Sequence, residues 1–196
     1  MQSQARTEKP PYLGLLNAIS LAESSAGVYL QAWADATDNE DLACTLRFVA
    51  ARETSHGEVF CRRLCELGYD LKPKADPAAD KRLAKYANPK VCDLDKLPED
   101  TDISVDAFAD IKSQLSAGHF DPMTANLMSW YIAEEYDSGA RLRAAYAQVR
   151  NRNGGAMANG RMASAPNAET EAIITCMTAG FARLEKSLEK LAKAMK

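Results

Sequence analysis

Glu53 and His56 are the residues of this chain best suited to do chemistry, because they lie three positions apart inside an otherwise apolar helical pattern. One turn of helix would place the two side chains next to each other, on the face that turns toward the core. A carboxylate buried without a partner costs several kcal/mol, so this pair requires a metal ion, a shared proton or a second charge. The apolar stripe around the pair consists of Leu42, Leu46, Val49, Phe60, Leu64 and Leu67.

Two helices must position this pair. Residues 11–36 are predicted to form the first, with apolar residues at intervals of three and four that are interrupted by Glu23. The second is predicted from residue 39, with Asp38 as its N-cap, to Gly68 as its C-terminal stop. Because only a few residues join them, the two helices are expected to pack antiparallel as a hairpin.

Residues 69–123 are expected to form a long connection and not a long helix, because five prolines interrupt them. A minor helix is predicted near 104–116, where Val105, Phe108 and Ile111 begin an apolar stripe. A connection of this length between long helices is typical of a segment that travels the length of the molecule.

A third long helix is predicted at about 124–151, and its apolar face is again interrupted by a glutamate. Glu135 is preferred over Glu134 for the inward position, because a face centred on Glu134 would bring Arg141 inward; Glu134 is expected to face solvent or a partner. An ungapped alignment of AESSAGVYLQA with EEYDSGARLRA places Glu23 over Glu135 and supports the same register.

A fourth helix is predicted near the C-terminus, after a Gly-, Ala- and Asn-rich loop near 152–166. Its apolar stripe contains no metal ligand, and no histidine follows His119, which is expected to lie in a surface loop. Tyr131 is interpreted either as a core residue or as a hydrogen-bond donor or redox-active phenol at the site, and Trp33 and Trp130 as core residues. The stripe of the fourth helix consists of Ile173, Met177, Phe181, Leu184, Leu188, Leu191 and Met195.

The composition favours one globular domain of residues 11–196 behind a flexible tail of residues 1–10, since 46% of the 196 residues are hydrophobic and 26% are charged. A net charge of -3 without a dense Lys/Arg block argues against nucleic-acid and membrane partners. The polar N-terminus and the lack of an uncharged apolar run of about 18 residues predict a cytoplasmic protein. The five cysteines form no C-x-x-C pair, so reduced thiols are expected.

This pattern resembles the ferritin-like superfamily, most closely the rubrerythrin-type proteins, and the phrases RETSHGEVF and WYIAEEYDSG carry the most specific part of the resemblance. Members of the superfamily bind two iron or manganese ions, using a Glu from each of two helices and a Glu-x-x-His from each of the other two. The resemblance implies that Glu23 is a terminal ligand, Glu53 a bridging carboxylate, His56 the nitrogen ligand and Glu135 the carboxylate of the third helix. The fourth helix departs from the pattern, because it lacks the second Glu-x-x-His.

The resulting prediction is an all-α protein, a ferritin-like four-helix bundle with one long crossover between its second and third helices. A full di-metal centre is not expected, because half of the ligand set is missing; one Fe, Mn or Zn ion at Glu23, Glu53, His56 and Glu135 is expected instead, for redox chemistry on a small-molecule substrate that the sequence does not identify. A homodimer is expected. Two alternatives remain open: a metal-free network in which a protonated His56 pairs with Glu53 or Glu23, and a non-catalytic binding or assembly module.

Overall fold

The computed structural model describes residues 9–98 and 106–157, and every regular element in these two ranges is a helix. This confirms the all-α class. The predicted fourth helix and most of the loop before it lie outside the described residues. The helices are α1 (Leu13–Ala36), α2 (Glu40–Glu66), α3 (Ala79–Tyr86), α4 (Asp93–Lys96), α5 (Ala109–Ser116) and α6 (Pro122–Met157).

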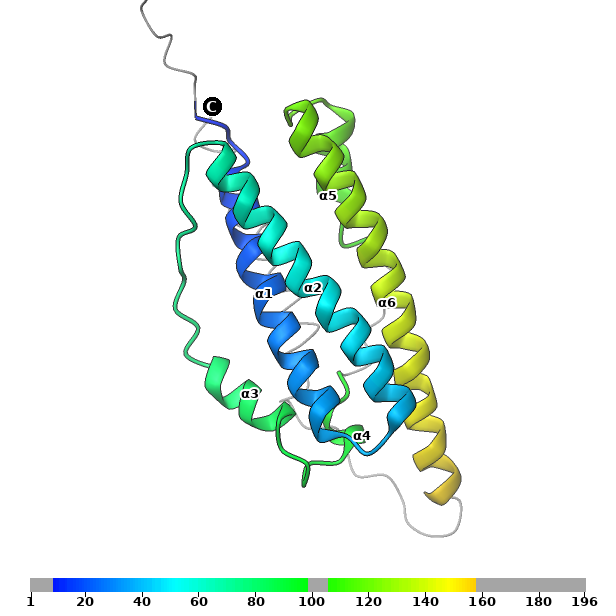
Figure 1. Cartoon of the computed structure of the whole chain (residues 1–196). Coiled ribbons are helices and arrows are strands. Elements are labelled where there is room, and N and C mark those ends of the chain that lie inside the picture. The colour runs from blue at the N-terminus through cyan, green and yellow to red at the C-terminus, as the bar shows by residue number, and fades with distance from the viewer. Residues whose placement is uncertain (1–8, 99–105, 158–196) are drawn as a thin grey trace, which may run out of the picture.

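Helices α1 and α2 form the predicted antiparallel hairpin and lie side by side (Figure 1). Asn39, and not the predicted Asp38, is the N-cap of α2, because its side-chain oxygen accepts a hydrogen bond from the backbone N–H of Leu42 at 3.3 Å. Asp and Asn are about equally good N-caps, so two adjacent residues of these types leave the choice to the backbone path. Gly68 follows the end of α2 as predicted, with a φ of 82° that favours glycine.

Two glycines let the backbones of α1 and α2 approach each other closely. A Cβ added at Gly57 of α2 would lie 2.2 Å from Oγ of Ser24 and 3.1 Å from the carbonyl oxygen of Ser20. A Cβ added at Gly27 of α1 would lie 2.4 Å from Oγ1 of Thr54. Atoms do not pack at these distances, so the spacing of the hairpin depends on the missing Cβ at both positions.

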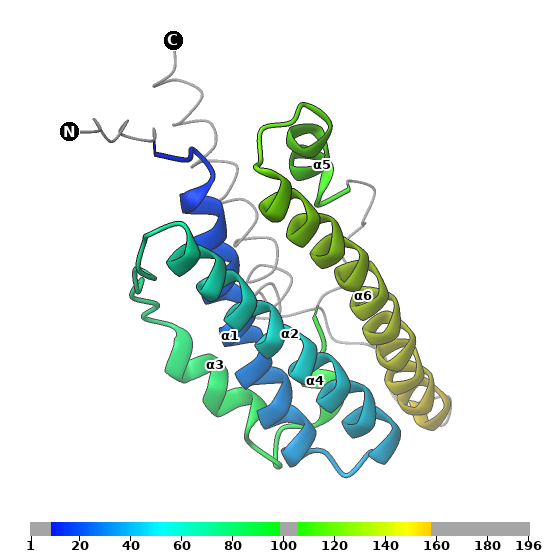
Figure 2. The same ribbon diagram turned by 45° about the horizontal axis from the view of Figure 1, so that its top comes forward.

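The described part of the connection between α2 and α6 contains only short helices. It begins and ends at the same end of the hairpin, because Arg63 near the end of α2 lies 2.8 Å from Asp121 just before α6. Helix α6 therefore runs antiparallel to α2, and the predicted crossover is not confirmed (Figure 1). After α2 the chain runs back in an extended path to α3, which packs on α1 (Figure 1). Helix α5 lies at the opposite end, against the start of α6 (Figure 1 and Figure 2). The minor helix predicted near 104–116 is α5, which begins at Ala109, and Phe108 and Ile111 are buried as expected.

Helix α6 packs against α2 and is longer than the predicted 124–151 (Figure 2). It begins at Pro122, and residues 152–157 are helical although a loop was predicted there. The glycines of this segment oppose a helix by only about 1 kcal/mol each, a preference that a long preceding helix can override.

Asp121 ties the start of α6 to the hairpin. Its carboxylate accepts a hydrogen bond from the backbone N–H of Met123 at 3.0 Å, as an N-terminal cap does. It also accepts hydrogen bonds from the hydroxyls of Tyr12 and Thr124, both at 2.6 Å, and from the Arg63 guanidinium at 2.8 Å. Partial burial acts to raise the pKa of Asp121, but the hydrogen bonds from these three side chains outweigh it and hold the pKa well below its usual value.

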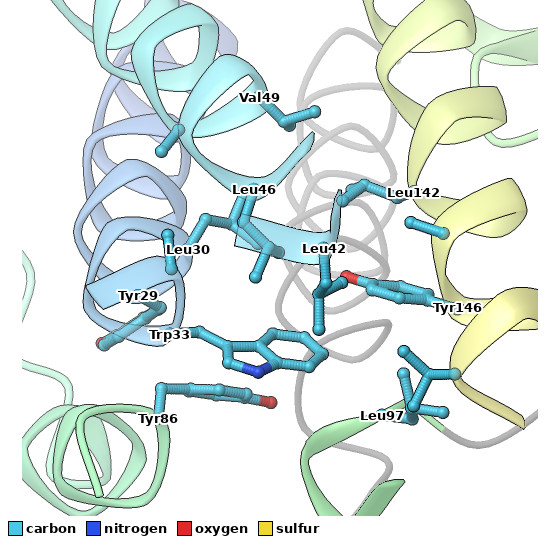
Figure 3. Packing of buried hydrophobic residues seen from close by; sticks show 14 residues of the cluster. Tyr29, Leu30, Trp33, Leu42, Leu46, Val49, Tyr86, Leu97, Leu142 and Tyr146 are labelled. Atoms are coloured by element: carbon cyan, nitrogen blue, oxygen red, sulfur yellow. The ribbon is translucent and has the colours of Figure 1, made fainter. Parts of the chain in front are cut away.

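The buried apolar side chains form two clusters, each of which joins α1, α2 and α6. One cluster lies toward the start of α1 and contains Phe60 and Tyr131. The other surrounds Trp33, whose ring centroid lies 5.6 Å from those of both Tyr86 and Tyr146 (Figure 3). Burial of these aromatic rings supplies much of the free energy that holds the three long helices together.

Helix α1 is the one described helix that is long and apolar enough to cross a membrane by length and composition. Half of that stretch is buried inside the protein, where α1 packs against α2. A core helix and an N-terminal signal sequence pass the same test, so the finding is weak evidence for a membrane span.

We predict that Gly57→Ala destabilises the protein by about 1–3 kcal/mol, because the new methyl group would push α1 and α2 apart. Gly14→Ala is the matched control, since Gly14 is exposed in α1 and an added Cβ there meets nothing within 4 Å. The control should keep its stability or gain up to about 1 kcal/mol. Urea unfolding followed by circular dichroism measures both changes, and equal stability of the two variants would contradict the close helix contact.

We predict that Asp121→Asn lowers the free energy of unfolding by about 1–2 kcal/mol at pH 7, because the amide loses the charge-assisted hydrogen bonds. A carboxyl group with a lowered folded-state pKa stabilises the protein above its unfolded pKa and loses that effect as pH falls toward the folded value. The difference between wild type and variant should therefore shrink below about pH 4. Urea midpoints at pH 7, 5 and 3 measure it, with the exposed Asp110→Asn as control; a loss that stays constant over this range is inconsistent with the ionic network.

Candidate metal centre

The four predicted site residues meet at one point between three helices. Helix α1 supplies Glu23, α2 supplies Glu53 and His56, and α6 supplies Glu135. Each of the four residues offers one possible ligand atom, and these four atoms all lie within 4.8 Å of one another. No more than 6% of any of the four residues is exposed. This group, called here the Glu/His cluster, can therefore hold one metal ion.

The cluster lies between the two apolar clusters along each helix. On α2, Glu53 lies between Val49 of one apolar cluster and Phe60 of the other, and Glu23 and Glu135 occupy the same place on α1 and α6. The two close glycine contacts of the hairpin occur one turn after Glu53 and one turn after Glu23. The hairpin therefore packs closely next to both carboxylates, and their oxygens lie within reach of one ion.

Several buried polar atoms of the cluster have no hydrogen-bond partner in the described part of the chain. They are Oε2 of Glu23, both carboxylate oxygens of Glu53, Nδ1 of His56 and Oε1 of Glu135. Ionised carboxylates only accept hydrogen bonds, so these oxygens cannot satisfy one another without an added proton or cation. Buried polar groups are almost always paired, and one cation at this point could pair one atom from each of the four residues. The residues present therefore fit a metal ion.

Glu134 fixes the orientation of the His56 ring. Its Oε2 lies 2.9 Å from Nε2 of His56, while Nδ1 of the same ring lies 3.2 Å from Oε1 of Glu135 and 4.0 Å from Oε2 of Glu23. If Nε2 carries the proton and its N–H donates a hydrogen bond to Glu134, the lone pair of Nδ1 faces the three carboxylates. A carboxylate behind a ligating imidazole is the usual way in which proteins orient a metal-binding histidine.

Glu134 is the functional residue that sequence reasoning missed. The structure places Glu135 in the core, as preferred, but Glu134 is only 29% exposed at its side chain and contacts His56 instead of facing solvent alone. The carboxylates nearest to His56 are those of Glu134 and Glu135, and Glu23 follows at 4.0 Å, so the alternative pairing of His56 with Glu23 stays open. The sequence shows Glu134 and Glu135 next to each other. Only the packing of α2 against α6 decides that Glu134 contacts Nε2 of His56 and Glu135 contacts Nδ1.

Tyr131 donates a hydrogen bond from its hydroxyl to Oε1 of Glu23 at 2.8 Å, so it acts as a donor to the site as well as a core residue. Burial and the carboxylates of Glu23 and Glu135 raise the pKa of Tyr131 well above its usual value. The phenol therefore keeps its proton and remains a donor. This bond satisfies one oxygen of Glu23 and leaves the other, Oε2, directed to the cluster.

The other aromatic and histidine predictions have mixed outcomes. Trp33 is a fully buried core residue whose indole N–H donates to Asp93 at 2.7 Å. The core prediction for Trp130 is wrong, because 39% of this residue is exposed and its ring packs edge-on against His56, with 4.9 Å between centroids. His119 is exposed, as predicted.

Protons take the place of a cation when no ion is bound. Burial raises the pKa of Glu53 to about 12, with further contributions from Glu23 and Glu135, and burial also raises the pKa of Glu23. Burial acts to lower the pKa of His56, but Glu135 and Glu134 outweigh it, so the pKa of His56 is raised. The metal-free protein at neutral pH thus holds Glu53 in its neutral form, and the carboxylates around His56 shift its pKa toward the protonated imidazole.

The chain matches no protein-family model, no curated protein and no solved structure.

We predict that Glu53→Gln becomes more stable than the wild type as pH rises from 5 to 9 in metal-free buffer. Because the pKa of Glu53 is 4.5 in the unfolded chain and about 12 in the folded protein, folding takes up a proton in this range. Wild-type stability should therefore fall with rising pH, by at most about 1.4 kcal/mol per pH unit, whereas glutamine does not titrate.

Urea unfolding in the presence of a chelator measures this difference. Glu58→Gln is the matched control, since Glu58 lies on the same helix but is exposed, and it should follow the wild type. A stability difference between Glu53→Gln and wild type that does not change with pH would show that Glu53 is ionised in the folded state.

Proposed function

We propose that the chain is a ferritin-like protein that binds one divalent ion, iron, manganese or zinc, in the Glu/His cluster. The observation that carries this proposal is the convergence of four buried side chains from three helices: their ligand atoms lie within 4.8 Å of one another, and each residue has a buried polar atom without a hydrogen-bond partner. Three carboxylates and one imidazole suit these ions better than they suit a soft metal such as copper(I). A divalent ion would displace the protons that otherwise neutralise the carboxylates.

The arrangement of the helices supports the ferritin-like part of the proposal. Three long helices, α1, α2 and α6, each bring a carboxylate to one shared site, as the helices of ferritin-like bundles do. The connection between α2 and α6 returns to the end of the hairpin where it began, so it is not a crossover. The apolar stripe from Ile173 to Met195 would supply the fourth helix. All four proposed ligands come from one chain, so the site does not depend on the proposed homodimer.

One ion fits the ligand set better than two. A two-metal centre needs carboxylates that bridge the ions and enough further ligands to hold them about 3.5–4 Å apart. The corresponding apolar stripe of the fourth helix offers Met177, Phe181 and Leu184 in place of a second Glu-x-x-His. The proposed ion would therefore have an oxygen-rich shell that water completes.

A redox-active ion in this shell would supply one-electron chemistry toward oxygen, peroxide or a small organic molecule. The residues around it have separate roles. Glu134 fixes the imidazole so that Nδ1 faces the cluster, and Tyr131 binds one oxygen of Glu23 so that the other is free. The apolar clusters on either side limit access of bulk water, which strengthens every electrostatic interaction within the site.

We predict that the protein purified without chelator contains about one metal ion per chain and that Glu53→Ala and His56→Ala each lose it. Removal of one ligand should weaken binding by about 100-fold or more, because the remaining buried carboxylates cannot complete the shell. Metal content is measured by inductively coupled plasma mass spectrometry. Affinity is measured by titration of metal-free protein with Co²⁺ and Zn²⁺.

Glu58→Ala is the control, because Glu58 is exposed on the same helix and should keep the ion. Absence of binding in the wild type would contradict the proposal. In that case a double variant, Glu53→Leu with His56→Leu, that folds with equal or higher stability would favour the non-catalytic binding or assembly module, because the polar cluster would then have no ligand to hold.

A further inference from the structure

A metal ion needs a route into the Glu/His cluster, since all four residues are buried. The seam between α1 and α2 is closed on either side of the cluster by the glycine contacts. The two apolar clusters close the described bundle above and below it. At the seam between α2 and α6, the fully buried His56 is covered by two partly exposed residues of α6, Glu134 and Trp130.

Glu134 is the charged group in this seam that contacts the cluster and also reaches solvent. Its side chain is 29% exposed, and its Oε2 lies 2.9 Å from Nε2 of His56. On the other side of that ring, Nδ1 lies 3.2 Å from Oε1 of Glu135. A single imidazole therefore separates a solvent-reaching carboxylate from the buried ones.

Arg52 lies beside Glu134 and brings the opposite charge to the same place. Its Nε lies 3.7 Å from Oε2 of Glu134. Its Nη1 donates hydrogen bonds to Asp137 at 2.9 Å, to the hydroxyl of Ser138 at 3.1 Å and to the backbone carbonyl of Glu134 at 3.1 Å. These bonds hold the guanidinium of α2 on α6, so a positive charge is fixed next to the carboxylate that reaches solvent.

We propose that Glu134 and Arg52 form the entry point for the divalent cation: Glu134 offers the arriving ion its first protein oxygen, and the charge of Arg52 limits the rate of entry. This inference rests on the proposed metal site. A carboxylate attracts a divalent ion and a guanidinium repels it, and both act over a few ångströms in a partly desolvated seam. The two residues should therefore change the rate of uptake in opposite directions.

The entry role predicts a different kinetic result from a role in positioning His56 alone. Glu134→Gln keeps an oxygen that accepts the proton of Nε2 and loses the charge. If Glu134 is part of the entry path, its loss raises the barrier that ions cross in both directions, so association and dissociation both slow. If Glu134 only orients the ring, the variant keeps the association rate and changes the dissociation rate, since the bound state alone is affected.

The test is stopped-flow mixing of metal-free protein with Co²⁺, whose absorption bands report binding, at low and high salt. Glu134→Gln should slow association on the order of fivefold at low salt, and Arg52→Gln should speed it by a similar factor. Both differences should shrink at high salt, because counterions screen the exposed charges. Matched controls are Glu66→Gln and Arg47→Gln, which change the same charges at exposed positions of α2 and should keep the wild-type rates.

The outcomes separate this inference from the proposed function. No Co²⁺ binding by the wild type would overturn both. Normal Co²⁺ binding with wild-type association rates in both Glu134→Gln and Arg52→Gln would overturn the entry point and leave the metal site standing. Should one of the two variants fail to fold by circular dichroism, the other decides: an association rate that differs from the wild-type rate at low salt and approaches it at high salt supports the entry point, and a wild-type rate overturns it.

Discussion

The burial of three carboxylates around one imidazole is the constraint on which the rest of this structure depends. Glu23, Glu53 and Glu135 come from three different helices and keep unpartnered oxygens in a region closed to solvent. Such an arrangement opposes folding unless positive charge is supplied, by protons or by a cation. The apolar clusters on both sides must therefore provide the stability that the polar layer between them does not.

The residues around the Glu/His cluster hold its four side chains in place through contacts that extend from the cluster to the surface. The glycine contacts between α1 and α2 set how closely two of the carboxylates approach. Tyr131 binds one oxygen of Glu23, and Glu134 holds the outer nitrogen of His56, so the inner atoms of both ligands keep a defined direction. Arg52 then links Glu134 to the protein surface. Preorganisation of this kind costs stability, and proteins concentrate it at sites that bind or react.

The prediction from sequence was most successful where a single helix decided the outcome. Apolar periodicity located α1, α2 and α6, and the glutamates that interrupt the stripes of these helices are the ones that reach the core. It was least successful at positions on the edge of a stripe. Glu134 and Trp130 border the buried face of α6, and their contacts with His56 depend on a residue of another helix.

The sequence by itself determined the helical class, the three long helices and the inward direction of Glu23, Glu53, His56 and Glu135, because helical periodicity is a local property of the chain. Only the tertiary structure decided that these side chains converge, that Glu134 holds the imidazole from outside and that α6 continues to Met157. Convergence depends on how three helices pack, through contacts between residues far apart in the chain. The apolar periodicity of one helix does not say which helices pack against it.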